Sequence, residues 1–308
     1  MMKKEEPKKS GKTILWTILG VLFVLFIVMP LTFSLFDRSA FGNVALIPIT
    51  GVITADGEGY FGKSTVSSQA IVDFIQKAED NSRVKVILLE INSPGGSAVA
   101  SDEIAGAVKA AKKPVIALIR EVGASGGYWV ASATDHIIAN RMSITGSIGV
   151  ISSYLEFSGL IEKYGVNYER LVAGEHKDIG TPYRPLDEQE RQILQGKLDK
   201  IHEFFIEEIA SNRGMKKTDV QKLATGEFYV GSEALENGLI DQLGDKKTAE
   251  EYIIQTYGLK EVEYVEYTET PGFLDFFSRI SSQFSFSMGQ GVGSALLEKE
   301  DKLTMMLR

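Results

Sequence analysis

The chain has 308 residues, of which 24% are charged, and its formal net charge at pH 7 is −8. The first 13 residues carry five Lys and two Glu, so the remainder is more acidic than the whole chain. Proteins that bind nucleic acid usually present a basic face, and we therefore expect no nucleic-acid partner. The absence of cysteine excludes disulfides, thiolate zinc sites and a cysteine nucleophile.

An uncharged apolar segment lies close to the N-terminus, at residues 14–36. It is longer than the roughly 20 residues that a membrane-spanning helix needs. A cleaved signal peptide has a shorter apolar core and a small-x-small exit, so the pattern favours a retained anchor. Lysines precede the segment and only Arg38 follows closely. The positive-inside rule therefore predicts a cytoplasmic basic tail at 1–13, a transmembrane anchor at 14–36 and an extracytoplasmic body.

The rest of the chain alternates between strand and helix patterns. Strands are predicted over 44–49, 84–91, 114–118 and 135–139 and at Val150, and helices over 67–80, 101–112, directly after Ser125, and over 186–210. This order indicates an α/β fold with a mostly parallel sheet covered by helices. The last helix is expected to start at Asp187 and Glu190. Its apolar stripe consists of Ile193, Leu194, Leu198, Ile201, Phe205 and Ile209.

Two glycine-rich segments, INSPGG at 91–96 and ASGGYW at 124–129, each follow an apolar strand. Gly95 and Gly96 can turn their N–H groups toward a common point more easily than residues that have a Cβ. Gly126 can add an N–H group at a helix N-terminus, where the helix dipole favours negative charge. Either segment alone is most simply a turn. Together they predict an oxyanion hole beside a nucleophile, Ser125, on a tight turn.

The base that would activate Ser125 is less clear from the residues alone. His136, at the start of an apolar strand, and His202, in the middle of a helix, have structural interpretations. His176 could complete a serine–histidine–aspartate arrangement. Its neighbour Lys177 is the competing base, although a lysine must become neutral to act, which requires burial among apolar groups. Both residues remain candidates at this point.

Five motifs in a fixed order bear on the family. They are NSPGG (92–96), ASGGYW (124–129), TGSIG (145–149), HKD (176–178) and GEFYVGSEALENGLIDQLG (226–244). Together they resemble the signal peptide peptidase A family of membrane-anchored peptidases, over roughly residues 44–265. The number of residues that separates Ser125 from Lys177 in the sequence is similar to that in the short, single-repeat form of the family.

The resemblance implies a Clp/crotonase-like fold of repeated ββα units, preceded by one N-terminal transmembrane helix. It implies a Ser–Lys dyad, with Ser125 as nucleophile and Lys177 as general base. Gly96 and Gly126 would be the oxyanion donors, and Ser147 would orient the lysine. Neither a metal nor a cofactor is implied. The expected substrates are short apolar peptides, chiefly signal-peptide remnants, and the expected assembly is a homo-oligomeric ring such as an octamer.

The predicted organisation places a catalytic peptidase domain at 44–267 and a C-terminal amphipathic segment with a flexible tail at 268–308. The apolar residues of this tail resemble the expected substrates, so the tail could enter an active site and be trimmed. Three other functions stay open: a dedicated protease for one membrane protein, a crotonase-type acyl-CoA enzyme, and a non-catalytic membrane scaffold.

Overall fold

The computed structural model describes residues 11–24, 42–57 and 64–268. The first of these ranges holds α1 (Gly11–Phe23), whose 13 residues cover the beginning of the predicted anchor. Residues 25–36 of that anchor lie outside the described residues, as does nearly all of the predicted C-terminal segment at 268–308. Within the ranges that are described, no helix combines the length and apolarity needed to cross a bilayer.

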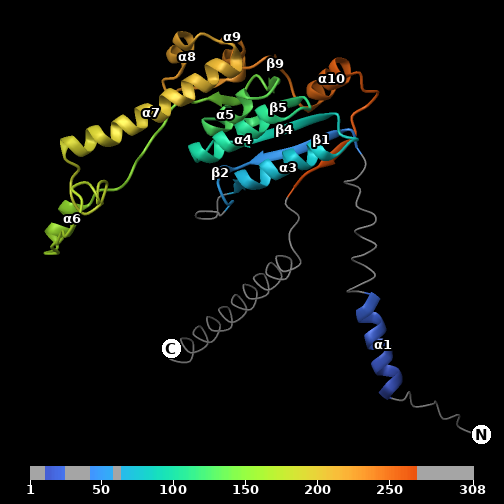
Figure 1. Ribbon diagram of the computed structural model, residues 1–308, viewed down its shortest axis with the longest axis horizontal. Coiled ribbons are helices and arrows are strands. Elements are labelled where there is room, and N and C mark those ends of the chain that lie inside the picture. Colours follow the sequence, from blue (N-terminus) through green and yellow to red (C-terminus); the bar gives the residue numbers. More distant parts are fainter. Residues whose placement is uncertain (1–10, 25–41, 58–63, 269–308) are drawn as a thin grey trace, which may run out of the picture. The chain divides into compact units, whose positions relative to one another are not determined.

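An eight-stranded sheet forms the centre of the described body (Figure 1). Its strands are β1 (Val44–Thr50), β4 (Val86–Ser93), β5 (Val115–Ala124), β6 (His136–Ala139), β7 (Ile144–Gly146), β8 (Phe228–Val230), β9 (Gln242–Leu243) and β10 (Tyr264–Glu266). The main path runs β10-β1-β4-β5-β6-β9, and all of its pairings are parallel. Beside the C-terminal half of β5, β7 pairs in parallel and then joins β8 in an antiparallel pairing. The predicted α/β class with a mostly parallel sheet is therefore confirmed.

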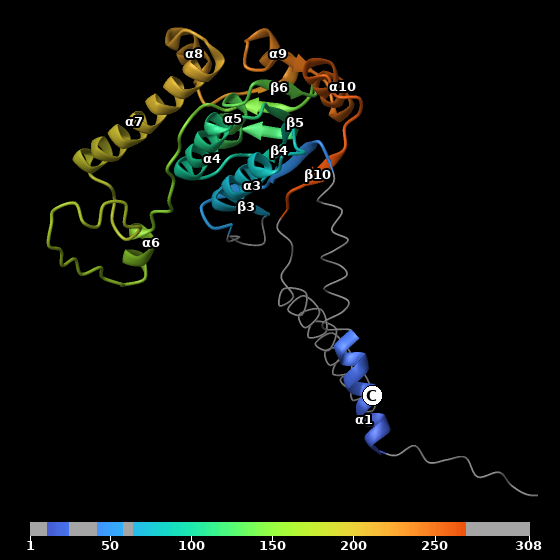
Figure 2. The same cartoon turned by 45° about the vertical axis from the view of Figure 1, so that its right-hand side comes forward.

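Helices cover both faces of this sheet, as Figures 1 and 2 show from two directions. In chain order, the helices between β1 and β10 are α3 (Ser68–Asp80), α4 (Ala98–Ala110), α5 (Gly126–Ser132), α6 (Ser158–Lys163), α7 (Glu188–Arg213), α8 (Lys217–Leu223), α9 (Gly231–Glu236) and α10 (Lys246–Tyr257). Of these, α6 lies away from the sheet. A small parallel pair, β2 (Val52–Thr54) and β3 (Thr65–Ser67), lies before α3 in the chain.

The central strands are buried on both faces, because alternate side chains enter two different apolar clusters. Ile87 and Leu89 of β4 belong to the larger cluster, with α3, α4, α5 and the C-terminal half of α7. Val86 and Leu88 belong to the smaller cluster, which α10 covers. This explains why these strands appear in the sequence as continuous apolar runs.

Two predicted elements differ from the observed ones, and the start of a third is confirmed. Helix α4 starts at Ala98, because the Ser97 side chain caps it, and not at Ser101. The strand expected at Val150 is wrong: β7 ends at Gly146, where positive φ values at Gly146 and Ser147 stop the extended backbone. The predicted start of α7 is confirmed as a reciprocal capping box.

The apolar stripe of α7 is only partly covered. Phe205 and Ile209, in its C-terminal half, are buried against the body. The four stripe residues that precede Phe205, namely Ile193, Leu194, Leu198 and Ile201, are half-buried. The sequence predicted the stripe, but the described residues bury only one end of it.

Candidate active site

Three segments predicted to carry the chemistry follow the C-terminal ends of three neighbouring parallel strands. The glycine loop at 94–96 follows β4, Ser125 follows β5, and Ser147 follows β7. Ligands of open α/β sheets bind at this edge, where the strands end. The topology therefore brings the predicted nucleophile, the glycines and Ser147 to one place.

The backbone at Ser125 has an unusual conformation, with φ 52° and ψ −123°. Such values are strained for a residue with a side chain, and strain of this kind tends to occur at functional sites. Two hydrogen bonds hold the turn: the Ser125 N–H donates to Gly146 O at 2.8 Å, and Ser125 O accepts from Trp129 N at 2.9 Å. The second bond belongs to the first turn of α5, so Ser125 sits at the N-terminus of that helix.

The glycine loop lies directly against this turn. Gly95 has φ +95°, and a Cβ there would lie 2.6 Å from Gly126 N and 2.9 Å from Ser125 Cβ. A Cβ on Gly126 would lie 3.3 Å from Gly96 N. The two segments that the sequence pairs as oxyanion donors are thus in van der Waals contact, and only glycine permits this approach.

The amides of Gly96 and Gly126 are free to bind a ligand. Among the described residues, neither N–H has a hydrogen-bond partner. The Gly96 peptide is fixed by its neighbours, since Ile53 N donates to Gly95 O and Ser97 N donates to Ile53 O, both at 2.9 Å. Two fixed, unpaired N–H groups beside a strained serine can stabilise a developing oxyanion.

Two serines that sequence reasoning did not assign to the site support these glycines. Ser93 Oγ accepts from the Gly95 N–H at 3.1 Å. Ser101 Oγ donates to Ser97 O at 2.9 Å. A Cβ on Gly126 would lie 2.2 Å from Ser101 Oγ. Both serines are fully buried. The NSPGG motif, which contains Ser93, is a sequence signal for the first of them, whereas Ser101 lies within α4 and has no such signal.

Ser147 is the second non-glycine residue with positive φ in the described chain, at 49°. Its N–H donates to Glu227 O at 2.9 Å and its Oγ donates to Gly226 O at 3.3 Å. Gly146 O accepts from Ser125 N, so the peptide between Gly146 and Ser147 itself holds the turn of the nucleophile. Its hydroxyl is partly exposed at the same edge of the sheet.

The structure does not bring Lys177 to Ser125. Lys177 is exposed, and across the described residues its ammonium group has no hydrogen bond or ion pair. It belongs to residues 150–187, here called the arm, which Figures 1 and 2 show beyond the α6 end of α7 and away from α5. His176, the alternative base, lies on the same arm. Neither candidate base therefore contacts the nucleophile within the described chain.

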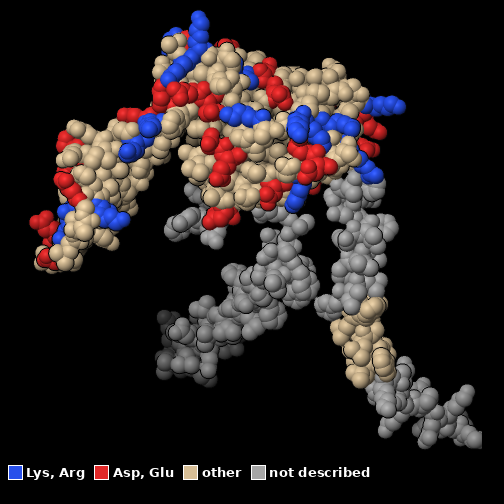
Figure 3. Space-filling model, viewed as in Figure 1, with Lys and Arg blue, Asp and Glu red and all other residues tan. Residues whose placement is uncertain are grey.

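The arm exposes many large apolar side chains. In Figure 3 uncharged atoms cover much of it and of the adjoining half of α7, with charged groups toward its tip. These exposed residues are Ile151, Tyr154, Leu155, Leu160, Tyr164, Val166, Tyr168, Leu171, Val172 and Tyr183. The hydrogen bonds of the arm run within itself and to the first turn of α7. An apolar surface of this extent indicates an interaction site.

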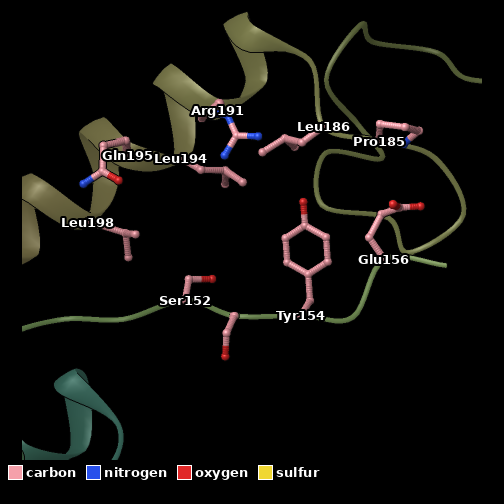
Figure 4. A pocket seen from close by; sticks show the side chains of 10 residues that line it. Ser152, Tyr154, Glu156, Pro185, Leu186, Arg191, Leu194, Gln195 and Leu198 are labelled. Carbon is pink, nitrogen blue, oxygen red and sulfur yellow. The ribbon is translucent and has the colours of Figure 1, made fainter. Parts of the chain in front are cut away.

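A groove of about 440 Å³ separates the arm from the N-terminal half of α7 (Figure 4). Tyr154 rises from the arm, and its hydroxyl points toward Leu186 and Leu194. Arg191 and Gln195 edge the opposite wall. Leu194 and Leu198, two of the half-buried residues of the α7 stripe, line this groove.

Two histidines have the structural roles that the sequence suggested. His136 stacks on Tyr252 with ring centroids 3.9 Å apart, and its Nε2 lies 3.1 Å from Gln242 Oε1. His202 lies within α7, and its Nε2 is buried without a partner in the described part of the chain. Both belong to helix or sheet packing and not to the site around Ser125.

Comparison with known proteins identifies the family. Residues 107–260 match the family model described as Peptidase family S49. The chain is 31% identical over 302 residues to "Putative protease MJ0651" of Methanocaldococcus jannaschii, covering 93% of this chain and 96% of that protein. The chain belongs to peptidase family S49.

Two further relatives are consistent with this. "Putative signal peptide peptidase SppA" of Enterococcus faecium is 34% identical over 236 residues, covering 75% of this chain and 69% of that protein. "Serine protease SPPA, chloroplastic" of Arabidopsis thaliana is 33% identical over 184 residues, covering 59% of this chain and 27% of that protein. The resemblance to the signal peptide peptidase A family is confirmed, and this S49 chain is a serine peptidase.

Proposed function

We propose that this S49 peptidase is a membrane-anchored serine endopeptidase with a Ser–Lys dyad. It would degrade cleaved signal peptides and other short apolar peptides outside the cytoplasmic membrane. The observation that carries the proposal is the strained Ser125 turn, set against the free amides of Gly96 and Gly126. The proposed fold is of the Clp/crotonase type, in which catalytic residues project from strand ends.

The proposed reaction proceeds through an acyl-enzyme. Ser125 Oγ attacks the scissile carbonyl carbon while its proton passes to neutral Lys177 Nζ, and the Gly96 and Gly126 N–H groups hold the resulting oxyanion. The C–N bond then breaks and Lys177 returns the proton to the leaving amine. A water molecule, deprotonated in turn by Lys177, attacks the ester carbonyl; the bond between the acyl carbon and Ser125 Oγ breaks, Lys177 returns the proton to Oγ, and the acid product leaves. Ser147 would orient the lysine through its hydroxyl.

The position of Lys177 bears on how the dyad forms. The arm that carries it joins the first turn of α7, and α7 packs on α5 only through its other half, where Phe205 stacks on Trp129. From Glu190 to Phe205 the helix rises about 22 Å, at 1.5 Å per residue. A lysine side chain is far shorter. We therefore propose that the subunits assemble into a closed ring in which each arm brings Lys177 to the Ser125 of a neighbour, with the exposed apolar surface as the contact.

A mixed-assembly experiment tests this proposal. Ser125→Ala and Lys177→Ala, each expressed alone, should lose peptide cleavage by several orders of magnitude, whereas Lys163→Ala, an exposed lysine on the same arm, should keep it. Co-expressed with different tags and purified through both, the two inactive variants should recover about a quarter of wild-type activity, the share of neighbouring pairs that combine an intact serine with an intact lysine.

Each failure has a distinct meaning. Verified mixed assemblies without activity would place the lysine in its own chain. An active Lys177→Ala would reject the lysine as base and direct attention to His176. Cleavage of a random peptide library by wild type, with Ser125→Ala as blank, tests the substrates: a preference for apolar and small residues supports signal peptides, and a single narrow motif favours a dedicated protease.

The anchor and its orientation remain part of the proposal. Residues 14–36 are uncharged and follow a basic tail, which supports an anchor with the catalytic domain outside. Protease protection of sealed membrane vesicles would measure this. A body that is digested from the cytoplasmic side would contradict the proposed orientation.

A further inference from the structure

Lys177 is exposed, but the segment that carries it is held in place by hydrogen bonds and ion pairs of charged residues before and after it in the sequence. Asp178, the next residue, accepts from two arginines: Arg170 donates to both carboxylate oxygens at 2.7 and 2.8 Å, and Arg184 donates at 3.0 and 3.3 Å. The Asp178 side chain is only 15% exposed. The two guanidinium groups hold the pKa of this carboxyl well below its usual range.

The same network reaches the start of α7. Arg184 makes two further bonds to the Glu190 carboxylate, at 2.7 and 2.5 Å, and that side chain is 2% exposed. Glu190 also accepts from Asp187 N at 3.3 Å as one half of the capping box. We call Arg170, Asp178, Arg184 and Glu190 the arginine clamp. It has two positive and two negative charges, and it ties the residue after Lys177 to a helix.

The backbone around Lys177 is fixed as well. Lys177 N donates to Gly174 O at 3.1 Å, and Arg170 donates to Glu175 O at 2.7 Å. Beyond Asp178, Thr181 N donates to Asp178 O at 3.0 Å. Arg170 therefore binds the chain on both sides of Lys177, at Glu175 and at Asp178. Arg184 in turn joins Asp178 to Glu190 in the first turn of α7. Only the side chain of Lys177 is left free.

An exposed lysine on a surface loop needs no such support, whereas a base that must reach a nucleophile within a few tenths of an ångström does. We infer that Asp178, Arg170, Arg184 and Glu190 are positioning residues that hold Lys177 at the end of α7 for its encounter with Ser125. This inference rests on the proposed role of Lys177 as the base. The C-terminal half of α7 packs on α5, and Ser125 precedes α5 directly. The clamp at the N-terminal end of α7 therefore fixes how far Lys177 lies from the Ser125 of the same subunit.

The test uses full-length protein and two matched substitutions of a carboxylate by its amide. Asp178→Asn removes a charge inside the clamp, and Glu188→Gln removes one outside it, in the first turn of α7. Glu188 is exposed, accepts from Gln192 Nε2 at 3.3 Å and lies 3.9 Å from Arg191. The measurements are kcat and KM for an apolar peptide, the rate of Ser125 labelling by a fluorophosphonate, and the thermal midpoint.

Asp178→Asn should lower kcat and the labelling rate about 10–100-fold, as removal of orienting partners does at other sites, with KM within about twofold. Glu188→Gln should change neither. Arg184→Ala should show the same loss, and millimolar guanidinium should restore part of it by filling the vacated site between Asp178 and Glu190. A merely structural loss would lower the thermal midpoint and would not be rescued in this way.

The outcomes separate the inference from the proposed function. Wild-type labelling in Asp178→Asn, together with an inactive Lys177→Ala, would overturn the clamp and leave the dyad intact. Wild-type labelling in Lys177→Ala would overturn the dyad itself. An equal loss in Glu188→Gln would show that the start of α7 is generally sensitive, which also overturns the clamp.

Discussion

The strained turn at Ser125 should cost stability that can be measured separately from activity. Ser125→Ala and Ser125→Gly both remove the hydroxyl, which has no hydrogen bond among the described residues. They differ in backbone freedom, because φ 52° with ψ −123° is open to glycine and strained for alanine. Both variants should be inactive, and the glycine variant should be the more stable of the two.

The size of the difference follows from two opposing terms. Relief of strain at such a residue contributes about 1–3 kcal/mol. The greater freedom of glycine in the unfolded chain takes back about 0.5–1 kcal/mol. The expected net gain of Ser125→Gly over Ser125→Ala is therefore about 1 kcal/mol. For a body of this size that corresponds to roughly 2–4 °C in thermal midpoint.

Thermal unfolding of the two full-length variants under identical conditions measures this. Ser211, exposed near the end of α7, provides the control. There the helical backbone suits alanine, so Ser211→Ala should be more stable than Ser211→Gly by up to about 1 kcal/mol. The sign should thus be opposite at the two serines. A Ser125→Gly variant that melts no higher than Ser125→Ala would refute the claim that the turn is strained.

Two further predictions concern packing and pH. Gly126→Ala places a Cβ 2.2 Å from Ser101 Oγ, so it should destabilise the protein by about 1–3 kcal/mol and greatly lower kcat. Adding Ser101→Ala should restore part of the stability, and a double variant without any recovery would contradict the contact. The control is Gly106→Ala, which should be neutral or stabilising because nothing lies within 4 Å of its Cβ. Burial raises the pKa of the Tyr128 phenol, which donates to Leu239 O at 2.7 Å. The neutral phenol therefore contributes its full share of the folding stability below pH about 10 and progressively less above it. Tyr128→Phe should lower the free energy of unfolding by about 1 kcal/mol at pH 7, and its denaturant midpoint should fall less steeply above pH about 10 than that of the wild type. A decline as steep as in the wild type would refute the assignment.

The sequence predicted the part of the site that is built from local signals. Apolar runs ending in glycines predicted strands that meet at one edge of a sheet, and Ser125 lies there beside Gly96 and Gly126. Short-range rules suffice for this arrangement, because parallel strands end together and only glycine fits between the turns. The displaced strand shows the limit of the same rules: Val150 suits a strand, but the positive φ values at Gly146 and Ser147 had already ended it.

The position of Lys177 could not be derived in this way. It depends on an arm of nearly 40 residues whose conformation is set by ion pairs outside any helix or strand repeat, such as Asp178 with Arg170, eight residues apart, and Arg184 with Glu190, six residues apart. No periodicity encodes such contacts. The only local signals were the HKD motif itself and the capping box at Asp187, and neither states where the arm points.

The long helix shows why the same pattern was partly right and partly incomplete. Amphipathic spacing predicts that one face of a helix is covered, but it does not say by which chain. In α7 the predicted stripe is buried at Phe205 and Ile209 by the helix's own subunit, and it remains half-buried at Leu194 and Leu198 beside the groove of the arm. If a neighbour's surface covers that second half, one helix fixes the nucleophile of its own subunit and carries the base for another. Oligomeric assembly would then be a condition of catalysis.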